Sequence, residues 1–275
     1  MNVRSVSCVC FSPTGTTKTI TESILQGIEP ESTEIVDATK RYTRNQYPLS
    51  FRSDLVILAT PVYCGRVPEE AATYFALFTA ERTPVVLVVV YGNRNFDDAL
   101  IELRDIATAR GFLPVAGGAF VAEHSYSSSS HPIAEGRPDE TDLNIARRFG
   151  ASVRAKLRNL DSLDNMTAIR VPGNYPYAQP KNLLLIKEAR AVVSFTPETG
   201  VNMCTQCGRC VEVCPTGAIS KEDVTKTDKW QCLICFACVK NCPEGARQMK
   251  DPHFNAAIRQ LHGECRERKE PELYL

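Results

Sequence analysis

The 275-residue sequence has no excess of charge of either sign, because 32 lysines and arginines balance 32 aspartates and glutamates. This balance gives no support for nucleic acid or an anionic membrane as the main partner. The longest apolar run, Val85 to Tyr91, is far shorter than the roughly 20 residues that span a bilayer. No apolar signal segment follows Met1, so we expect a cytoplasmic protein without a membrane span.

Two common nucleotide-binding motifs are also missing. The dinucleotide fingerprint G-x-G-x-x-G is absent, which excludes an ordinary NAD domain. Lys18 is not part of a phosphate loop of the type G-x-x-x-x-G-K-[ST], because Val9, Cys10 and Phe11 precede Ser12 where the earlier glycine is required. An ATP-hydrolysing site is therefore not expected.

Cysteine, by contrast, is abundant, and eight of the 12 cysteines fall in two copies of the spacing C-x2-C-x2-C-x3-C-P near the C-terminus. Four thiolates hold one [4Fe–4S] cluster, and in the bacterial two-cluster arrangement the fourth cysteine of each run ligates the other cluster. The predicted ligand sets are Cys204, Cys207, Cys210 and Cys242 for one cluster, and Cys232, Cys235, Cys238 and Cys214 for the other.

Other uses of these cysteines fit the spacing less well. Zinc closes with four ligands, typically as two separated pairs, whereas each run here has three cysteines at successive intervals and a fourth after them. Disulfides are disfavoured because the clustering suits a reducing compartment. The spacing is similar to that of bacterial two-cluster ferredoxins over roughly residues 200 to 250.

The N-terminal part alternates apolar strands with amphipathic helices. Because the strands are almost continuously apolar, they are expected to be buried on both faces of a parallel sheet. We therefore expect an α/β doubly wound, five-stranded parallel sheet of flavodoxin order, 2-1-3-4-5, followed by a small α+β ferredoxin-like domain. The expected strands are residues 3–11, 33–36, 54–60, 84–92 and 113–122, and the expected helices follow residues 15, 68, 96 and 139.

These patterns divide the chain into four segments. The flavodoxin-like domain is expected to cover residues 1–160 and the two-cluster domain residues 200–251. Residues 161–199 form a connector whose stretch VPGNYPYAQP contains three prolines and a glycine, and whose stretch LLLIKEARAVV has a helical pattern. Residues 252–275 are expected to form a C-terminal helix and tail.

A polar loop, Ser12 to Thr17, lies between the first strand and the first helix. Backbone N–H groups at a helix N-terminus bind anions, hydroxyl groups add donors, and Gly15 permits close approach. Simple helix capping is the alternative. The loop resembles the flavodoxin signature [ST]-x-T-G-x-T, a resemblance that implies binding of the FMN phosphate here. The predicted phosphate-site residues are Ser12, Thr14, Gly15, Thr16 and Thr17.

In the flavodoxin fold FMN lies at the carboxyl ends of the strands, beside the switch point between strands one and three. The loops after strands three and four should therefore flank the flavin ring. Tyr63 could stack on the ring, and Arg66 or Arg94 could place positive charge near it, although a loop anchor and surface charges explain these residues equally well. The predicted ring-site residues are Pro61, Val62, Tyr63, Cys64, Gly65, Tyr91, Gly92, Asn93, Arg94 and Phe96.

Catalytic residues are weakly indicated. His124 and Tyr126, in the serine-rich loop after strand five, could donate a proton to a substrate, and Tyr63 is a third candidate. A surface turn is the favoured interpretation of that loop. Cys64 follows Tyr63 in the flavin loop and could have its thiol pKa lowered by Arg66, but an inert thiol is favoured.

At the level of the whole chain, the sequence resembles the family of fused flavodoxin and ferredoxin proteins. The resemblance runs from the N-terminus to about residue 250 and includes the stretches PVYCGRVP, YGNRNFDDAL, AFVAEHSYS and HPIAEGRPDETDL. It implies an iron–sulfur electron-transfer protein that binds FMN and two [4Fe–4S] clusters, without supplying a substrate.

Three functions fit these cofactors. The first is an oxidoreductase in which a redox partner such as ferredoxin reduces the clusters, the clusters reduce FMN, and FMN reduces a small molecule or protein under the loop at 124–131. The second is an electron carrier between two enzymes, and the third is an NAD(P)H-dependent quinone or flavin reductase. Should the clusters lie too far from FMN in one chain, a homodimer would be required.

Overall fold

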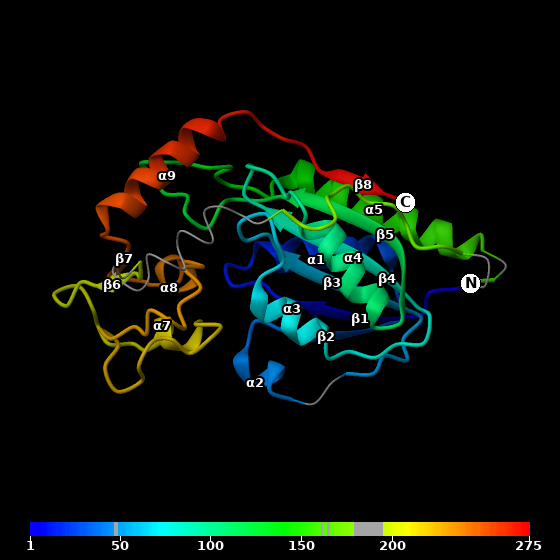
Figure 1. Ribbon diagram of the computed structural model, residues 1–275, viewed down its shortest axis with the longest axis horizontal. Coiled ribbons are helices and arrows are strands. Elements are labelled where there is room, and N and C mark those ends of the chain that lie inside the picture. The colour runs from blue at the N-terminus through cyan, green and yellow to red at the C-terminus, as the bar shows by residue number, and fades with distance from the viewer. Residues whose placement is uncertain (47–48, 161, 164–165, 179–194) are drawn as a thin grey trace.

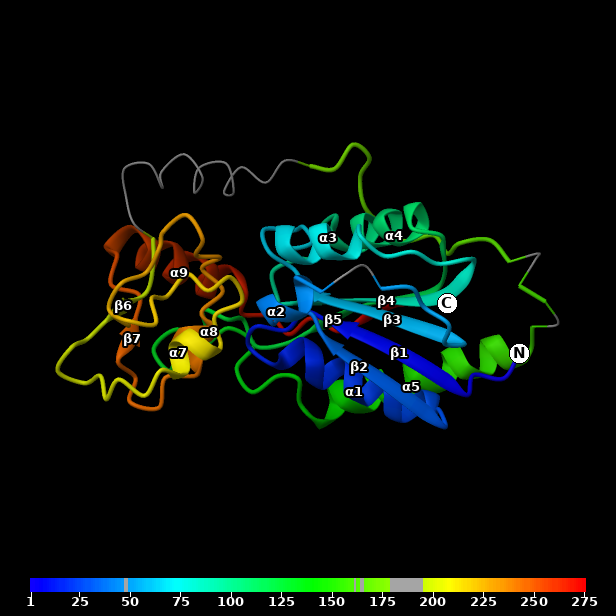
Figure 2. The same ribbon diagram turned by 90° about the horizontal axis from the view of Figure 1, so that it is seen from below.

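The protein was analysed as a computed structural model that describes residues 1–46, 49–160, 162–163, 166–178 and 195–275. Two parts lie side by side: a sheet covered by helices, and a smaller loop-rich unit that contains both cysteine runs (Figures 1 and 2). The helical pattern expected at residues 183–193 lies outside the described residues. Within the described ranges, no helix has the length and apolar composition needed to cross a bilayer.

The sheet has the predicted order. Five parallel strands are arranged 2-1-3-4-5, which confirms the flavodoxin-like topology. A sixth strand, which the sequence did not predict, comes from the C-terminal tail and pairs antiparallel with β5, with Leu273 opposite Gly118. The strands are β1 (Ser5–Cys10), β2 (Ser32–Asp37), β3 (Leu55–Pro61), β4 (Thr83–Tyr91), β5 (Phe112–Val121) and β8 (Glu272–Tyr274).

Helices cover both faces of the sheet, which is why its central strands are apolar throughout. Helices α1 (Thr16–Ile28) and α5 (Glu140–Arg158) cover one face, and α3 (Glu69–Phe75) and α4 (Ala99–Ala109) cover the other (Figure 2). Helices α1 and α5 pack backbone to backbone, since a Cβ on Gly150 would lie 2.1 Å from the carbonyl oxygen of Ile24. Glycine is the residue that permits this approach.

The smaller unit repeats one backbone conformation in its two cysteine runs. Gln206 and Ile234, at equivalent positions, have φ of 56° and 54°, and Gly208 and Phe236 have φ of 75° and 60°. Positive φ is costly for Ile and Phe, so the surrounding loops must impose it. The unit contains the hairpin of β6 (Glu198–Thr199) and β7 (Arg247–Gln248) and the short helices α7 (Arg209–Glu212) and α8 (Ala237–Lys240).

The second cysteine run lies against the carboxyl edge of the sheet. Lys240, in α8, donates hydrogen bonds to Glu123 (2.6 Å) and to the Ser127 carbonyl (2.8 Å). The Tyr126 ring packs 4.6 Å from that of Phe236. On the other side, helix α2 (Arg41–Arg44) contributes Arg44, which donates to the Pro215 carbonyl (2.5 Å).

The chain returns to the sheet through helix α9 (Pro252–Glu264), which is capped by Asp251 and packs Phe254 and Ile258 against the second cysteine run. The C-terminal tail then runs along the sheet to β8 (Figure 1). The segment expected as a simple tail therefore ties the two parts together.

Candidate functional site

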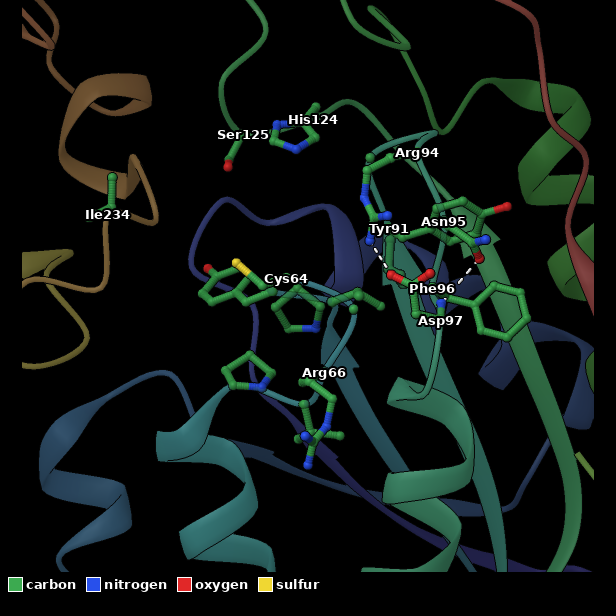
Figure 3. A pocket seen from close by; sticks show the side chains of 18 of the residues that line it. Cys64, Arg66, Tyr91, Arg94, Asn95, Phe96, Asp97, His124, Ser125 and Ile234 are labelled. Atoms are coloured by element: carbon green, nitrogen blue, oxygen red, sulfur yellow. Dashed lines mark hydrogen bonds and ion pairs between the residues drawn. The ribbon is translucent and has the colours of Figure 1, made fainter. Parts of the chain in front are cut away.

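A cavity of about 1840 Å³ lies where the loops after β3, β4 and β5 face the smaller unit. Figure 3 shows Cys64, Arg94 and His124 around this space, with Ile234 of the second cysteine run at its border. Most of the predicted flavin-site residues line it, as do all three catalytic candidates. The lining includes Thr14, Thr16, Pro61, Val62, Tyr63, Cys64, Gly65, Tyr91, Gly92, Arg94, Phe96, His124 and Tyr126.

The Ser12–Thr17 loop forms the turn into α1. Gly15 has a φ of 92° and caps the helix, which exposes first-turn N–H groups that have no intrahelical acceptor. Thr14 and Thr16 border the cavity, whereas Thr17 is buried and Ser12 accepts a hydrogen bond from the Lys18 N–H (3.0 Å). No acidic residue stands in the first turn of α1. These donors fit the phosphate of FMN.

The loops after β3 and β4 pack tightly on each other. Tyr63 and Arg66 exchange backbone hydrogen bonds of 3.0 Å around a turn in which Cys64 and Gly65 have positive φ. A Cβ on Gly65 would lie 2.3 Å from Asp97 Oδ2. The turn therefore requires glycine both for its conformation and for the contact.

The two candidate arginines have different surroundings. Arg66 forms a bidentate pair with Glu102, with both N···O distances 2.8 Å, and its guanidinium lies over the Tyr177 ring. Arg94 pairs with Asp97 at the rim and is 44% exposed. The Arg66 charge is thus balanced inside the fold. Arg94 is the cation that faces the cavity mouth.

Cys64 is an unactivated thiol. Burial raises its pKa, and the charge of Arg94 opposes this only in part. The expectation that Arg66 would lower this pKa is not met, because Glu102 holds that guanidinium.

Asn93 uses its side chain to hold the C-terminal tail. Its amide donates to the carbonyls of Cys265 (2.9 Å) and Glu267 (2.7 Å), and its oxygen accepts from the Lys269 N–H (3.2 Å). The residue is buried and its side chain is not part of the cavity lining among the described residues. Asn93 therefore contributes to the site by fixing the position of the loop that contains it.

His124 and Tyr126 lie at the junction of the two parts, which differs from the surface turn favoured by the sequence. His124 Nδ1 accepts a hydrogen bond from the Tyr126 N–H (3.1 Å), so its Nε2 holds the proton. Burial, assisted by Arg94 and Lys240, lowers the pKa of His124 to about 4. His124 is therefore neutral at pH 7.

Two walls of the cavity come from segments that sequence reasoning did not assign to it. Pro172, Gly173, Asn174 and Ala178 belong to the connector, and α9 contributes Phe254, Ile258 and Leu261. Trp230 is largely exposed and also lines this cavity. No motif marked these residues, because long-range packing alone brings them to the site.

Asp98 fixes the connector wall. It is 1% exposed and accepts hydrogen bonds from the Asn174 N–H (2.8 Å) and the Ala178 N–H (2.7 Å). Burial disfavours the charged form, but these hydrogen bonds outweigh it and lower the pKa of Asp98. The carboxylate thus organises backbone around the cavity and has no free oxygen to offer a ligand.

The structure brings cysteines from the two runs close to each other. Cys204, Cys207, Cys210 and Cys242 line one small hollow. Around Cys235, burial raises the thiol pKa, and Cys238, Cys232 and Cys214 are close enough to raise it further.

Backbone donors support the fourth cysteine of each run in the same way. The Ala218 N–H lies 3.3 Å from Cys214 Sγ, and the Ala246 N–H lies 3.2 Å from Cys242 Sγ. Such N–H groups can donate hydrogen bonds to the sulfurs of a bound cluster. The residues present therefore fit [4Fe–4S] ligation.

Tyr63 links the two kinds of site. Burial raises the pKa of its phenol, and the nearby Cys235 and Tyr126 raise it further. Leu233 and Ile234, the two residues before Cys235, also line the cavity. The second cysteine run is consequently a wall of the cavity.

Comparisons with known proteins agree with this division. Residues 203–247 match one family model described as a 4Fe–4S dicluster domain, and residues 167–218 match another of the same description. No curated protein matches the chain.

Three solved structures illustrate the similarity of the N-terminal part. A flavodoxin from the domain Archaea has 15% identity and a TM-score of 0.37, covering 56% of this chain and 99% of its own. A WrbA-like flavodoxin from Agrobacterium tumefaciens has 19% identity and a TM-score of 0.38, covering 56% and 97%. Flavodoxin 2 from Bacillus cereus has 17% identity and a TM-score of 0.40, covering 55% and 99%. The fold assignment itself rests on the sheet order.

The flavodoxin-like sheet and the 4Fe–4S dicluster region together define an electron-transfer protein with a flavin part and an iron–sulfur part. This is the fused organisation predicted from the sequence. The matched region fits [4Fe–4S] clusters, and the cavity with its phosphate loop fits FMN.

Proposed function

We propose that this protein is a ferredoxin-linked oxidoreductase that collects single electrons in its iron–sulfur part and delivers them in pairs, through FMN, to a small molecule. The observation that carries this proposal is that Leu233 and Ile234, beside Cys235, form part of the wall of the flavin cavity. Clusters exchange one electron at a time, whereas bound FMN supplies two-electron chemistry.

The first cysteine run suits the entry of electrons. The hollow lined by its first three cysteines is separate from the cavity, and Cys207 is exposed together with Val201 and Met203. A partner such as ferredoxin can approach an exposed site of this kind. The proposed ligands of this cluster are Cys204, Cys207, Cys210 and Cys242, and those of the inner cluster are Cys232, Cys235, Cys238 and Cys214.

The protein residues have separable roles in the cavity. Thr14, Thr16 and the first-turn amides of α1 bind the phosphate of FMN. Tyr63 separates the ring site from the inner cluster, and Arg94 supplies positive charge at the mouth. The neutral His124 offers a hydrogen-bond donor at Nε2 to a ligand in the cavity.

The size of the cavity supports a substrate site in addition to the flavin site. Pockets for one small ligand are typically about 300–1,000 Å³, whereas the described residues enclose about 1840 Å³. A pure electron carrier needs only an accessible ring edge. We therefore favour an enzyme over a carrier.

None of the twelve cysteines, all of which lie in the described residues, forms a disulfide bond. Cysteines without disulfides in this number suit a reducing compartment. We propose a cytoplasmic location on that basis.

Purification and reduction under anaerobic conditions test the function. The protein should contain about eight iron atoms and one FMN per chain, as two clusters and one flavin require. Reduced ferredoxin should bleach the flavin and sustain repeated reduction of a small acceptor without a second protein. Rapid bleaching by NADH or NADPH would instead favour the reductase, and turnover only with a protein acceptor would favour the carrier. Zinc in place of iron would contradict all three.

A matched pair of variants locates the flavin. Thr14→Val combined with Thr16→Val should reduce the FMN content at least tenfold, because both hydroxyls leave the phosphate loop, while the iron content stays unchanged. Thr19→Val is the control, since Thr19 is exposed on the same helix and its hydroxyl bonds only to the Gly15 carbonyl. Retention of FMN by the double variant would place the flavin elsewhere.

A further inference from the structure

Arg247, in β7, is a charged side chain in the interior of the iron–sulfur part. It is 2% exposed. One terminal nitrogen donates to Thr199 Oγ1 (2.7 Å) and the Val224 carbonyl (3.3 Å), and the other donates to Thr227 Oγ1 (3.0 Å). The third nitrogen, Nε, is buried and has no hydrogen-bond partner in the part of the chain that the structure describes.

The acceptors around Arg247 do not balance its charge. They are two hydroxyls, a carbonyl and a thiol, and no carboxylate pairs with it among the described residues. An arginine side chain stays protonated in proteins. Buried charges are paired or coordinate metals, because an isolated charge in the interior is costly. A bound anion next to Arg247 would therefore stabilise this buried charge.

The guanidinium lies near cysteines of both sets. Its second terminal nitrogen lies 3.8 Å from Cys238 Sγ, which belongs to the inner set. The side chain also lines the hollow formed by Cys204, Cys207, Cys210 and Cys242. Arg247 is thus the positive charge between the two sites.

We propose that Arg247 is the shared counter-ion of the two clusters and raises the reduction potential of both, an inference that rests on the proposed cluster sites. Each cluster with its four thiolates is anionic, and a one-electron donor adds one further negative charge without forming or breaking a bond. A nearby buried cation stabilises that added charge, because the interior screens it poorly. Net charge and hydrogen bonds around the sulfurs are what set such potentials.

Arg247→Gln tests the proposal, because glutamine keeps amide donors and removes the charge. Anaerobic redox titration followed by electron paramagnetic resonance should show both clusters becoming harder to reduce, each by at least about tenfold in the reduction equilibrium, which is about 59 mV for one electron. The control is Arg209→Gln, since Arg209 is next to Cys210 in sequence but is exposed and paired with Glu212. The control should change the reduction equilibrium constant of each cluster by less than twofold.

A second pair of variants keeps Arg247 in place. Thr227→Asp sets a carboxylate beside the guanidinium, with Thr227→Asn as its neutral counterpart. Thr227→Asp should lower both reduction potentials, as Arg247→Gln does. Thr227→Asn should change each reduction equilibrium constant by less than twofold. This pair remains informative if Arg247→Gln does not retain iron.

The titrations distinguish a failure of the role of Arg247 from a failure of the proposed cluster sites. Wild-type protein without eight iron atoms would contradict the cluster sites themselves. Suppose that wild type and variants all contain eight iron atoms. Unchanged reduction potentials in Arg247→Gln or Thr227→Asp would then show that Arg247 has only a structural role. A shift in only one cluster would overturn the shared role.

Discussion

At the scale of single residues, several polar side chains near the cavity are committed to the fold. Arg66 is paired with Glu102, Asp98 binds connector backbone, and Asn93 binds the tail. Groups that can serve a ligand include the phosphate-loop hydroxyls of Thr14 and Thr16 and the Nε2–H of His124. The positions of the loops were predictable from the sequence. Which of their side chains stabilise the fold and which can bind a ligand depends on partners that are distant in sequence.

His124 gives a pH dependence of stability. Its pKa is about 4 in the folded protein and 6.5 when unperturbed, with burial as the main cause of the difference. Below pH 6.5 the unfolded chain therefore binds a proton that the folded chain does not, and stability falls as the pH falls towards 4. The loss between pH 7 and pH 5 should be about 2 kcal/mol.

Urea unfolding of wild-type protein and His124→Asn at pH 7 and pH 5 checks this value. The variant should lose about 2 kcal/mol less than wild type over this interval, because asparagine does not titrate. His131→Asn is the comparison, since it changes a histidine in the same loop. Equal losses in His124→Asn and wild type would show that His124 protonates freely in the folded protein.

At the scale of elements, the C-terminal strap formed by α9, the following tail and β8 joins both parts. Its tail residues Arg268 and Lys269 contact the start of α5: Arg268 pairs with Asp139 and Asp142, and the Lys269 carbonyl accepts from Arg137. Asp142 is 0% exposed and also forms a bidentate pair with Arg137. One carboxylate therefore holds a helix start and the strap together.

Replacing Asp142 by asparagine should destabilise the protein by about 3 kcal/mol or more, because Arg137 would be left buried with a weaker partner. Denaturant unfolding monitored by far-ultraviolet circular dichroism measures the change. Glu140→Gln is the control in the same helical turn, and because its carboxylate is exposed the cost should stay below about 1 kcal/mol. Similar costs for the two variants would mean that the buried network contributes no more than a surface pair.

At the scale of the whole molecule, one chain brings the flavin cavity and the inner cysteine run together. Tyr126 packs against Phe236 and Phe254, and Lys240 of α8 bonds to the loop after β5. The homodimer considered from the sequence is therefore not required to bring the cavity and this cysteine run together.

This arrangement predicts electron passage within a chain. After a rapid pulse of reductant, flavin bleaching should follow a first-order rate that stays constant over a hundredfold range of protein concentration. Lys240→Gln should slow this phase, since it weakens the contact between α8 and Glu123, whereas Lys226→Gln, at an exposed site in the same unit, should not. A rate that rises in proportion to concentration would instead indicate transfer between chains.

The sequence by itself determined the features that depend on local spacing. Two copies of C-x2-C-x2-C-x3-C-P specify iron–sulfur ligation because all but one ligand of each cluster come from one short run. Apolar strands alternating with amphipathic helices likewise predicted a parallel sheet covered on both faces, because helices on each side are required to bury such strands.

Only the tertiary structure decided how these parts are used. The burial of Arg247 between the cysteine sets, the neutral state of His124, the connector wall at Asp98 and the sixth strand each depend on contacts between distant segments. Burial and charge pairing are properties of the packed molecule, so no local pattern in the sequence encodes them.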